Sequence, residues 1–448
     1  MKLLIVNYRY FLSGGPERYL FKVEELFRQH GDEVFILSAR DPRNRPCPQE
    51  AYFVEGRGND VYFNKIRLTP ANAFKLLKGA FYNPAAARNL KRMIRDLRPD
   101  AVYVLQQNNL LSPAVFMAAR QAGVRVVHRL SDYNLMCPRF DFLRNDAPCE
   151  KCLSGSLWNA VRYKCVQHSF SASLVRVLSM YFHRWIGAFD CVDAFIVTNH
   201  FMEKKLEEFG VSPERILLVS TFIDSAATAP RYEHQGYVLY LGRLEPEKGP
   251  QYAVAAMPHL ADLNLRLKLT GTLADDPTGR LADLVQDHQL AEQVDFVGFV
   301  HGAELDNLIA GAMCILCPSV LYDNLPNVLL EAAAHGKPVI APDHGCFPDV
   351  VEDGCTGLLF TPGSARDLAQ KIRMLHTTPG LAETLGRNAR AKCEREYTPA
   401  RHYRDLCRVL QPESARPEPI ETQTPLPVHG VTQKEPAGQG PPDSRGHT

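Results

Sequence analysis

Three absences narrow the class to which this 448-residue protein belongs. The 51 basic and 50 acidic side chains leave a net charge of only +1 at pH 7, so the chain lacks the positive excess with which nucleic-acid binders attract phosphates. No apolar run approaches the ~18 residues that a membrane-spanning helix requires. The opening segment, MKLLIVNYRY, has too short an apolar part for a secretory signal and is predicted to be a buried strand. The sequence therefore predicts a globular cytoplasmic protein that does not bind nucleic acid.

Cysteine, in contrast, is plentiful. Twelve cysteines in a chain without an export signal are expected to be reduced thiols, which agrees with a cytoplasmic location. A hydrophobic content of 45% and a charged content of 23% are typical of a folded globular protein. Because 448 residues exceed what one ordinary core can hold, the length predicts two domains.

Apolar runs that alternate with amphipathic segments predict an α/β fold built twice. The predicted strands of the first half are 3–6, 34–38, 101–105, 124–128, 194–198 and 216–219, and those of the second half are 237–241, 265–271, 294–300, 315–317 and 339–341. The predicted helices include 88–98, 170–190, 200–209, 326–335, 365–376, 381–396 and 400–410. We expect two Rossmann-like, doubly wound parallel sheets, whose ligands bind outside the carboxyl ends of the strands.

The predicted domains follow from this alternation. Residues 1–220 form the first domain, 221–236 a linker with few apolar residues, and 237–410 the second domain. Residues 411–448 carry eight prolines and four glycines with almost no large apolar side chains. Such a composition cannot bury enough surface to fold alone, so it predicts a disordered tail.

The stretch 315–342 carries the first candidate site. An apolar strand runs into Pro318-Ser319, and a loop and a helix that ends before Gly336 follow. Asp323 lies on the loop and Glu331 lies eight residues later, inside the helix among apolar neighbours. The free backbone N–H groups of Asn324 and Leu325 at the helix mouth can hold hydroxyls or an anion. A helix dipole and a surface salt bridge would explain the position of one of these carboxylates. They would not explain the whole motif in residues 315–342.

A second candidate site follows the strand 237–241. Arg243 and Lys248 lie on the loop at its carboxyl end, where a planar guanidinium and an ammonium can clamp a diphosphate. Because cations are common on loops, Arg243 and Lys248 alone would be a weak indication of a site. The Asp323 and Glu331 unit, which is predicted to belong to the same sheet, strengthens it. No Asp-x-Asp follows a strand to hold a divalent ion, which agrees with chemistry that needs no metal cofactor.

These motifs resemble the retaining family 4 glycosyltransferases, a group with the GT-B fold. The resemblance covers roughly residues 1–410 and rests on Gly242-Arg243 with Lys248-Gly249, on Pro318-Ser319, and on Asp323 with Glu331-Ala332 and Gly336-Lys337-Pro338-Val339. Two departures are Asp323, where the family usually has Glu, and Asn324-Leu325-Pro326, where Gly-Phe-Pro is commoner. The resemblance implies two domains facing a cleft that binds a nucleotide diphosphate sugar.

The resemblance also implies roles for individual residues. Arg243 and Lys248 would stabilise the leaving diphosphate, Glu331 would hold the ribose hydroxyls, and Asn324 and Leu325 the sugar hydroxyls. Asp323 would face the reacting sugar. Gly14, Gly15 and Gly271 would line the donor cleft, and the segment 294–300 resembles the one whose backbone holds the base. The turns at Gly14-Gly15 and Gly271 are alternatively ordinary βα turns, and Gly14-Gly15 lacks the later glycine of a dinucleotide-binding fingerprint.

His128 ends the predicted strand 124–128. A lone histidine is usually structural, but the family has a histidine at an equivalent strand end that contacts the donor sugar. The resemblance therefore places His128 among the catalytic candidates. Arg129 follows it, where many relatives have Asp or Asn.

Four cysteines fall close together at 137, 149, 152 and 165. Cys137, Cys149, Cys152 and Cys165 could form a tetrahedral zinc site or bind an iron–sulfur cluster, and their spacing is closer to a zinc ribbon. The polar insertion 138–164 has little core of its own, so a structural zinc would help to order it. Free thiols and a redox pair at Cys149 and Cys152 are the alternatives. Cys314 and Cys317 lie in an apolar run and are predicted to be core residues.

Two helices bear on membrane contact. The basic face of 88–98 is either a solvated surface or a contact for anionic lipid headgroups. The apolar helix 170–190 is expected to be core rather than membrane anchor. The expected function is transfer of a sugar to a glycan or lipid-linked acceptor in polysaccharide synthesis, with peripheral contact at the inner membrane face. A nucleotide-sugar epimerase of the same fold and a non-catalytic nucleotide-sugar-binding partner are the alternatives.

Overall fold

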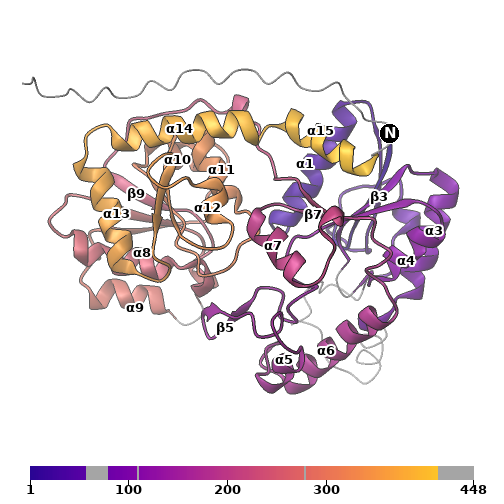
Figure 1. Ribbon diagram of the computed structural model, residues 1–448. Helices are drawn as coiled ribbons and strands as arrows, with labels where there is room; N and C mark the ends of the chain where they lie inside the picture. The colour runs from indigo at the N-terminus through magenta and orange to yellow at the C-terminus, as the bar shows by residue number, and fades with distance from the viewer. Residues whose placement is uncertain (57–78, 108–109, 277–278, 412–448) are drawn as a thin grey trace, which may run out of the picture.

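The computed structural model describes residues 1–56, 79–107, 110–276 and 279–411, and its chain forms two α/β domains side by side (Figure 1). Each domain is built on a six-stranded sheet in which every pairing is parallel. The first sheet has the order β2-β1-β3-β4-β7-β8 and the second β11-β10-β9-β12-β13-β14. This doubly wound arrangement confirms the fold class expected from the sequence. The predicted tail lies outside the described residues from residue 412 onward.

The strands of the first sheet are β1 (Lys2–Asn7), β2 (Glu33–Leu37), β3 (Ala101–Gln106), β4 (Arg125–Arg129), β7 (Ala194–Val197) and β8 (Ile216–Leu218). Helices of this half are α1 (Gly15–Gln29), α3 (Pro84–Leu97), α4 (Ala114–Gln121), α5 (Trp158–Arg162), α6 (Phe170–Trp185) and α7 (His200–Glu208). The cysteine-rich insertion adds a short antiparallel pair, β5 (Leu143–Arg144) and β6 (Ala147–Pro148).

The strands of the second sheet are β9 (Tyr237–Tyr240), β10 (Arg266–Thr270), β11 (Val294–Gly298), β12 (Ile315–Leu316), β13 (Val339–Pro342) and β14 (Gly357–Phe360). Its helices are α8 (Pro250–Ala256), α9 (Arg280–Asp287), α10 (Ala303–Gly311), α11 (Asn327–Ala334), α12 (Phe347–Val350), α13 (Ala365–Thr377) and α14 (Leu381–Glu396). The last helix of the described residues is α15 (Pro399–Leu410).

Both sheets are buried on both faces, which explains why their strands appear in the sequence as continuous apolar runs. In β1, Leu4 and Val6 belong to the core on one face, while Leu3 and Ile5 belong to the core on the other. All four side chains are fully buried. Successive residues of a strand point to opposite faces, so one apolar run supplies both cores.

Helix α15 follows the second domain in the sequence but packs against the first domain. Leu406, Val409 and Leu410 of α15 pack into the core beneath β1, and the carbonyl oxygen of Val409 accepts a hydrogen bond of 2.8 Å from Arg125 Nε. Figure 1 shows α14 along the second domain and α15 over α1 of the first. The predicted second domain, 237–410, therefore needs correction, because the apolar face of the final helix is buried against the first sheet.

Two predicted helices also differ from the structure. α11 begins at Asn327, because Pro326 occupies the preceding cap position with an extended backbone (φ −63°, ψ 128°). The predicted helix 170–190 ends at Trp185, shortly before Gly187, whose φ is +62°. α6 is also less buried than expected of a core helix, since Phe170 is 57% and Trp185 83% exposed. Across the described ranges, no helix combines the length and apolar character needed to cross a bilayer.

Candidate nucleotide-sugar site

Two loops at the carboxyl edge of the second sheet are joined tightly to each other. The loop after β9 meets the loop after β12, where Val320 N and Ser319 Oγ donate to the Glu247 carbonyl oxygen over 3.0 and 3.2 Å. Gly249 has a φ of +75°, and a Cβ there would lie 1.9 Å from the Pro318 carbonyl oxygen. Only glycine permits this approach. The contact fixes the position of Lys248 relative to Asp323.

Lys248 and Asp323 form an ion pair between these loops. Their side chains are 23% and 13% exposed. Burial opposes the charge of the ammonium, but the charge and hydrogen bond of Asp323 outweigh burial, so the pKa of Lys248 is raised. The other carboxylate oxygen of Asp323, Oδ2, is buried without a hydrogen-bond partner among the described residues. The pair thus presents a fixed cation beside a buried acceptor oxygen that has no partner among the described residues.

Arg243 lies on the same loop and is the more exposed cation, with 62% of its side chain accessible. It pairs with Glu245. The backbone around it is packed against the end of β10, because a Cβ on Gly271, whose φ is +116°, would lie 2.5 Å from the Gly242 carbonyl oxygen. Glycine at position 271 therefore allows the ends of β9 and β10 to approach each other closely next to Arg243.

Glu331 of α11 faces the first domain. Burial raises the pKa of its carboxyl group, and the charges of Arg18 and Lys22 of α1 partly oppose this rise. The same elements approach at their N-termini, where a Cβ on Gly15 would be 3.9 Å from Asn327 Nδ2. Gly14 is the extended cap residue of α1. The glycine turn of the first domain and the Glu331 helix of the second thus face each other across the domain boundary.

Asn324 connects the site directly to the first domain. Its backbone carbonyl oxygen accepts from Thr198 Oγ1 over 3.1 Å and from Asn199 Nδ2, and its own Nδ2 donates to the Leu130 carbonyl oxygen over 2.9 Å. In the described part of the chain, no hydrogen bond engages the backbone N–H of Asn324 or Leu325. The first domain therefore holds the carbonyl side of this peptide segment and leaves its N–H groups available.

His128 points away from these groups. Its ring is 1% exposed and packs with Phe116 and Phe195, with ring centroids 5.0 and 6.1 Å away. Nδ1 lies 3.0 Å from the Val104 carbonyl oxygen, which can only accept, so Nδ1 carries the proton. Nε2 is buried and has no hydrogen-bond partner among the described residues. The geometry shows a packed neutral imidazole, and a contact with the donor sugar stays a prediction.

The burial of His128 predicts acid sensitivity. Desolvation lowers the pKa of His128 to about 4, against ~6.5 in an unfolded chain. Between these values the unfolded state binds a proton that the folded state does not, so stability is complete above pH ~6.5 and is lost as the pH falls toward 4. We expect roughly 3 kcal/mol from this group. Urea denaturation at pH 7 and pH 4.5 should show a smaller loss for His128→Phe than for the natural chain, with exposed His288→Phe as control.

The four cysteines of the insertion lie in one neighbourhood. Burial, followed by the nearby Cys137, Cys165 and Cys149 sulfurs, raises the pKa of Cys152 to about 12. All twelve cysteines are free thiols. Within the described ranges, no group of three or more His, Cys, Asp or Glu side chains is arranged to hold a metal ion. A structural zinc at these four cysteines stays a prediction. A small core that includes Leu157, Val161 of α5 and Met180 of α6 packs the insertion against α6.

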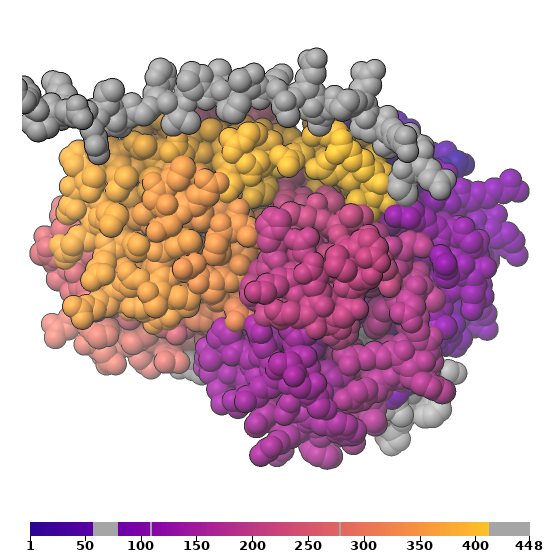
Figure 2. Space-filling model, viewed as in Figure 1, coloured from indigo at the N-terminus to yellow at the C-terminus, as the bar shows by residue number. Residues whose placement is uncertain are grey.

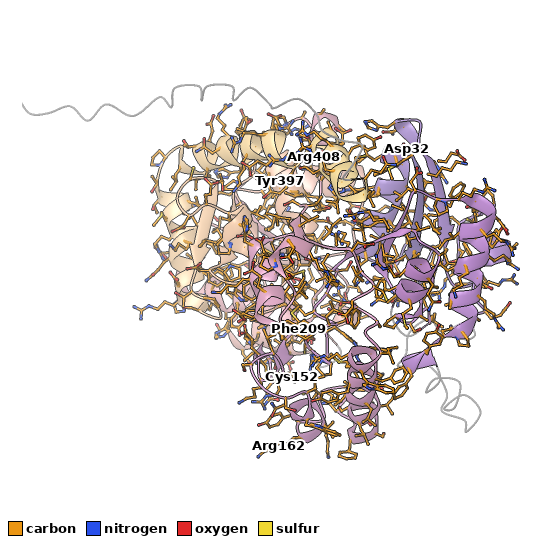
Figure 3. All side chains as sticks on the ribbon, turned by 45° about the vertical axis from the view of Figure 1, so that its right-hand side comes forward. Asp32, Cys152, Arg162, Phe209, Tyr397 and Arg408 are labelled. Carbon is orange, nitrogen blue, oxygen red and sulfur yellow. The ribbon has the colours of Figure 1, made fainter. Side chains whose placement is uncertain are left out.

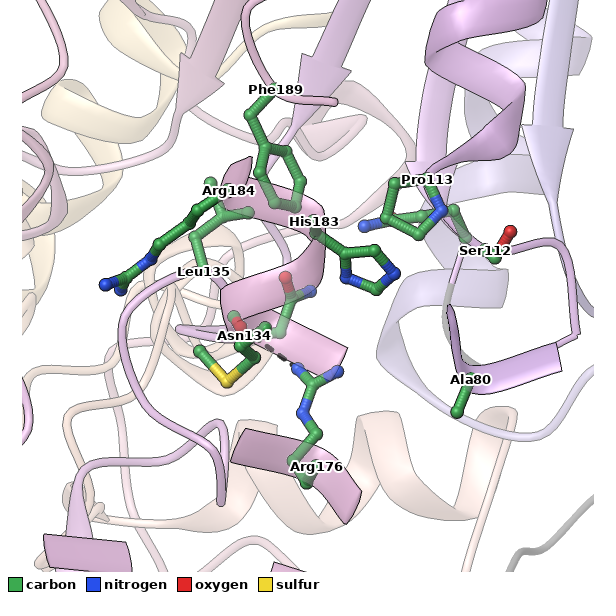
Figure 4. Close-up of a pocket in the computed structure, with 11 residues that line it drawn as sticks. Ala80, Ser112, Pro113, Asn134, Leu135, Arg176, His183, Arg184 and Phe189 are labelled. Atoms are coloured by element: carbon green, nitrogen blue, oxygen red, sulfur yellow. Dashed lines mark hydrogen bonds between the residues drawn. The ribbon is translucent and has the colours of Figure 1, made fainter. Parts of the chain in front are cut away.

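A small pocket opens at the carboxyl edge of the first sheet (Figure 4). Ser112, which follows β3, lines it together with Asn134, which follows β4, and with Arg176 and His183 of α6. The Arg176 guanidinium points into the pocket, where Nη2 donates to the Asn134 carbonyl oxygen over 3.0 Å. The pocket combines a cation with backbone acceptors, and it lies on the domain opposite the Lys248 loop.

The sequence did not predict which residues of the first domain approach the Asp323 loop and Glu331. Arg18 and Lys22 are four residues apart on the helix after Gly14-Gly15, and that spacing could have placed them on one face. Thr198 ends a predicted strand and could have been flagged by its position. No sequence signal marks Tyr133, whose buried hydroxyl has no partner among the described residues and whose pKa burial raises, with a smaller contribution from Asp323.

Two doubly wound domains with cations at a carboxyl edge and a glycine turn opposite define a protein of the GT-B fold class. A family model described as glycosyl transferases group 1 matches residues 224–392, and a model described as glycosyl transferase 4-like domain matches residues 14–221. The two matches together account for most of the chain, which belongs to the group 1 glycosyltransferases.

Individual relatives agree with this assignment. A glycogen synthase of Mycobacterium tuberculosis is 31% identical over 213 residues, 46% of this chain and 50% of that protein, so the match spans about half of the relative. Sucrose-phosphate synthase from Thermosynechococcus elongatus has a similar structure, with a TM-score of 0.64 at 20% identity over 90% of this chain and 98% of that one. Anabaena HepE in complex with UDP and glucose gives 0.63 at 17% identity over 92% and 99%. At these identities the two structures establish the fold.

Proposed function

We propose that this protein is a retaining glycosyltransferase that moves a sugar from a nucleotide diphosphate to a glycan or lipid-linked acceptor in polysaccharide or glycoconjugate synthesis. The observation that carries the proposal is the ion pair between Lys248 and Asp323, with Arg243 on the same loop. The ion pair holds the Lys248 ammonium at the carboxyl edge of the second sheet. Doubly wound sheets bind their ligands at this edge. The relatives add the reaction class, and HepE, whose complex contains UDP and glucose, makes uridine diphosphate sugars the first donors to test.

Departure of the nucleotide diphosphate places negative charge on its phosphate oxygens. An ammonium has three N–H donors, so Lys248 can keep Asp323 as a partner and still donate to the phosphate. Arg243, which is more exposed, offers a planar fork for a second phosphate oxygen. These fixed donors stabilise charge as it develops, and the proposed transfer therefore proceeds without a catalytic metal.

The remaining donor groups are assigned to the surrounding residues. Glu331 would hold the ribose hydroxyls, and the available N–H groups of Asn324 and Leu325 would hold hydroxyls of the sugar. Asp323 Oδ2, which has no partner in the described structure, would face the reacting sugar. Because Thr198 and Asn199 bind the Asn324 carbonyl, closure of the two domains would orient the sugar-binding amides and exclude water at the same time.

The acceptor would bind on the first domain. The pocket around Arg176 lies at the carboxyl edge of that sheet and offers a cation and polar atoms. A cytoplasmic location with peripheral contact at the inner membrane face fits a lipid-linked acceptor. From the four-cysteine spacing we also propose a structural zinc held by Cys137, Cys149, Cys152 and Cys165.

Variants of Asp323 test the proposal. We expect Asp323→Asn to lower sugar transfer strongly and Asp323→Glu to retain much of it, because Glu keeps the charge that pairs with Lys248. Asp262→Asn, a change at the exposed ion pair with Arg373, is the control. Product analysis with labelled donor distinguishes the alternatives. A transferred sugar with the donor's anomeric configuration supports the proposal, whereas an epimerised donor, or donor binding without turnover, contradicts it.

Metal analysis tests the zinc prediction separately. Zinc that co-purifies with the natural chain and is lost in Cys152→Ser supports a structural site, with exposed Cys355→Ser as control. The expected consequence of a chelator is a lower midpoint of thermal unfolding with no change in the transfer rate at a temperature where the fold persists. A metal-free preparation with an unchanged midpoint contradicts the prediction.

A further inference from the structure

The surface formed by α5 and α6 combines exposed aromatic side chains with unbalanced positive charge. α6 carries a stripe at helical spacing, made up of Phe170, Leu174, Leu178, Tyr181 and Trp185. Phe170 is 57%, Leu178 41% and Trp185 83% exposed, while Leu174 and Tyr181 lie partly buried against α5. Val177 and Met180, on the adjoining side of the helix, are buried in one small core with Leu174 and Tyr181. Phe170, Leu178 and Trp185 are therefore the part of this apolar surface that stays exposed.

The charge of this region departs from that of the whole chain. Residues 151–186 contain five Lys or Arg and no Asp or Glu, although the complete sequence balances 51 basic against 50 acidic side chains. Four of the five are exposed, namely Lys151, Arg162, Lys164 and Arg184. None of these four forms an ion pair within the described residues. The exposed cations of this surface therefore have no ion-pair partner in the described part of the chain.

The two helices project from the molecule. Figures 1 and 2 show α5 and α6 at the lower edge of the first domain, away from the second domain, and Figure 3 places Cys152 and Arg162 in the same projection. Trp158 of α5 is 49% exposed, and its ring centroid lies 6.2 Å from that of Tyr181. The exposed aromatic side chains and the free cations are therefore carried by the same two helices and their connecting segment.

From this combination we propose that the α5–α6 surface binds an anionic lipid bilayer. Trp and Phe side chains partition into the interface between headgroups and acyl chains, while Lys and Arg pair with anionic headgroups. α6 also lines the Arg176 pocket with Met180 and His183. Lipid binding at the outer face of this helix would place the pocket beside the membrane, where a lipid-linked acceptor is found. The binding itself does not depend on the proposed transfer reaction.

The chain contains a built-in reporter, because its only two tryptophans, Trp158 and Trp185, both lie on this surface. We expect vesicles of phosphatidylcholine and phosphatidylglycerol to shift the tryptophan emission of the full chain to shorter wavelength, and brominated acyl chains to quench it. Pure phosphatidylcholine vesicles should bind at least tenfold more weakly, and high salt should weaken binding to the anionic vesicles. Absence of binding to anionic vesicles would overturn the proposal.

Variants separate this surface from the others. Phe170→Ser with Leu178→Ser should lower co-sedimentation with anionic vesicles about tenfold or more, and Arg162→Gln with Lys164→Gln should lower it by about fivefold per charge. Phe299→Ser, at a 73% exposed position of the second domain, should have no effect. Loss of binding on neutralising Arg88 and Lys91 of α3, with the α6 variants unaffected, would contradict the proposal. So would sedimentation equilibrium showing that the aromatic stripe pairs two copies of the chain and that vesicles do not compete.

Discussion

Lys248→Met and Arg243→Gln are each expected to lower kcat/KM for sugar transfer by about 10²–10³-fold, the effect of losing one preorganised donor at a developing negative charge. Lys248 is the stronger case, because it is the less exposed of the two and is held by Asp323. Titration calorimetry with a nucleoside diphosphate should show weaker binding in parallel. Arg266→Gln, at the opposite edge of the same sheet, removes an exposed cation and should change neither quantity.

The buried partner complicates the lysine variant, because Lys248→Met leaves the Asp323 carboxylate without its cation. The double variant Lys248→Met with Asp323→Asn removes both charges and separates two explanations. If Lys248 acts only by neutralising Asp323, the double variant should recover affinity for a nucleoside diphosphate, although transfer stays low because Asp323 is also lost. If the ammonium contacts the phosphates, the double variant should bind the nucleoside diphosphate as weakly as Lys248→Met. Unchanged donor affinity and transfer rate after loss of both Arg243 and Lys248 would contradict the assignment of the site.

Gly249→Ala is expected to destabilise the second domain by about 3 kcal/mol or more and to reduce activity with it. A left-handed backbone costs a non-glycine residue roughly 1–2 kcal/mol. Here the added Cβ would also lie 1.9 Å from the Pro318 carbonyl oxygen, so the two loops must separate. That separation would displace Lys248 from Asp323. The free energy of unfolding from urea denaturation and the transfer rate measure the two effects.

Gly380→Ala isolates the backbone contribution. Gly380 has a φ of +74°, nearly that of Gly249, but a Cβ there would meet nothing within 4 Å. We expect this control to lose only about 1–2 kcal/mol and to keep full activity. Equal losses in the two variants would show that the contact with Pro318 does not hold the loops together.

The strands and the order of the motifs could be predicted because they are local properties of the chain. β1, β3 and β9 are apolar runs bounded by polar turns, and burial on both faces of a parallel sheet requires such runs. The Lys248 loop and the Asp323 loop could also be placed near each other, since both follow strands of one sheet. The sequence did not show that they form an ion pair, because that depends on the register of strands 75 residues apart.

The sequence predicted where helices form more readily than it predicted which core each helix packs against. An amphipathic pattern at 400–410 indicates that α15 buries one face, but it does not indicate which core receives it. The same limit applies to α6, whose apolar residues predicted a core helix although Trp185 is 83% exposed. For His128, the strand was predicted to within one residue, since β4 ends at Arg129, but the parity of the strand decides whether its ring faces the cleft or Phe116.

The sequence alone determined that this chain forms two parallel α/β domains and that its charged motifs follow the carboxyl ends of strands. Those properties depend on neighbours a few residues apart, where steric preference and hydrophobic periodicity act. Only the tertiary structure decided that Asn199 of one domain binds the Asn324 carbonyl of the other, 125 residues away, and that the last helix crosses back to the first sheet. These contacts depend on how two completed cores meet, and no local pattern of side chains records that geometry.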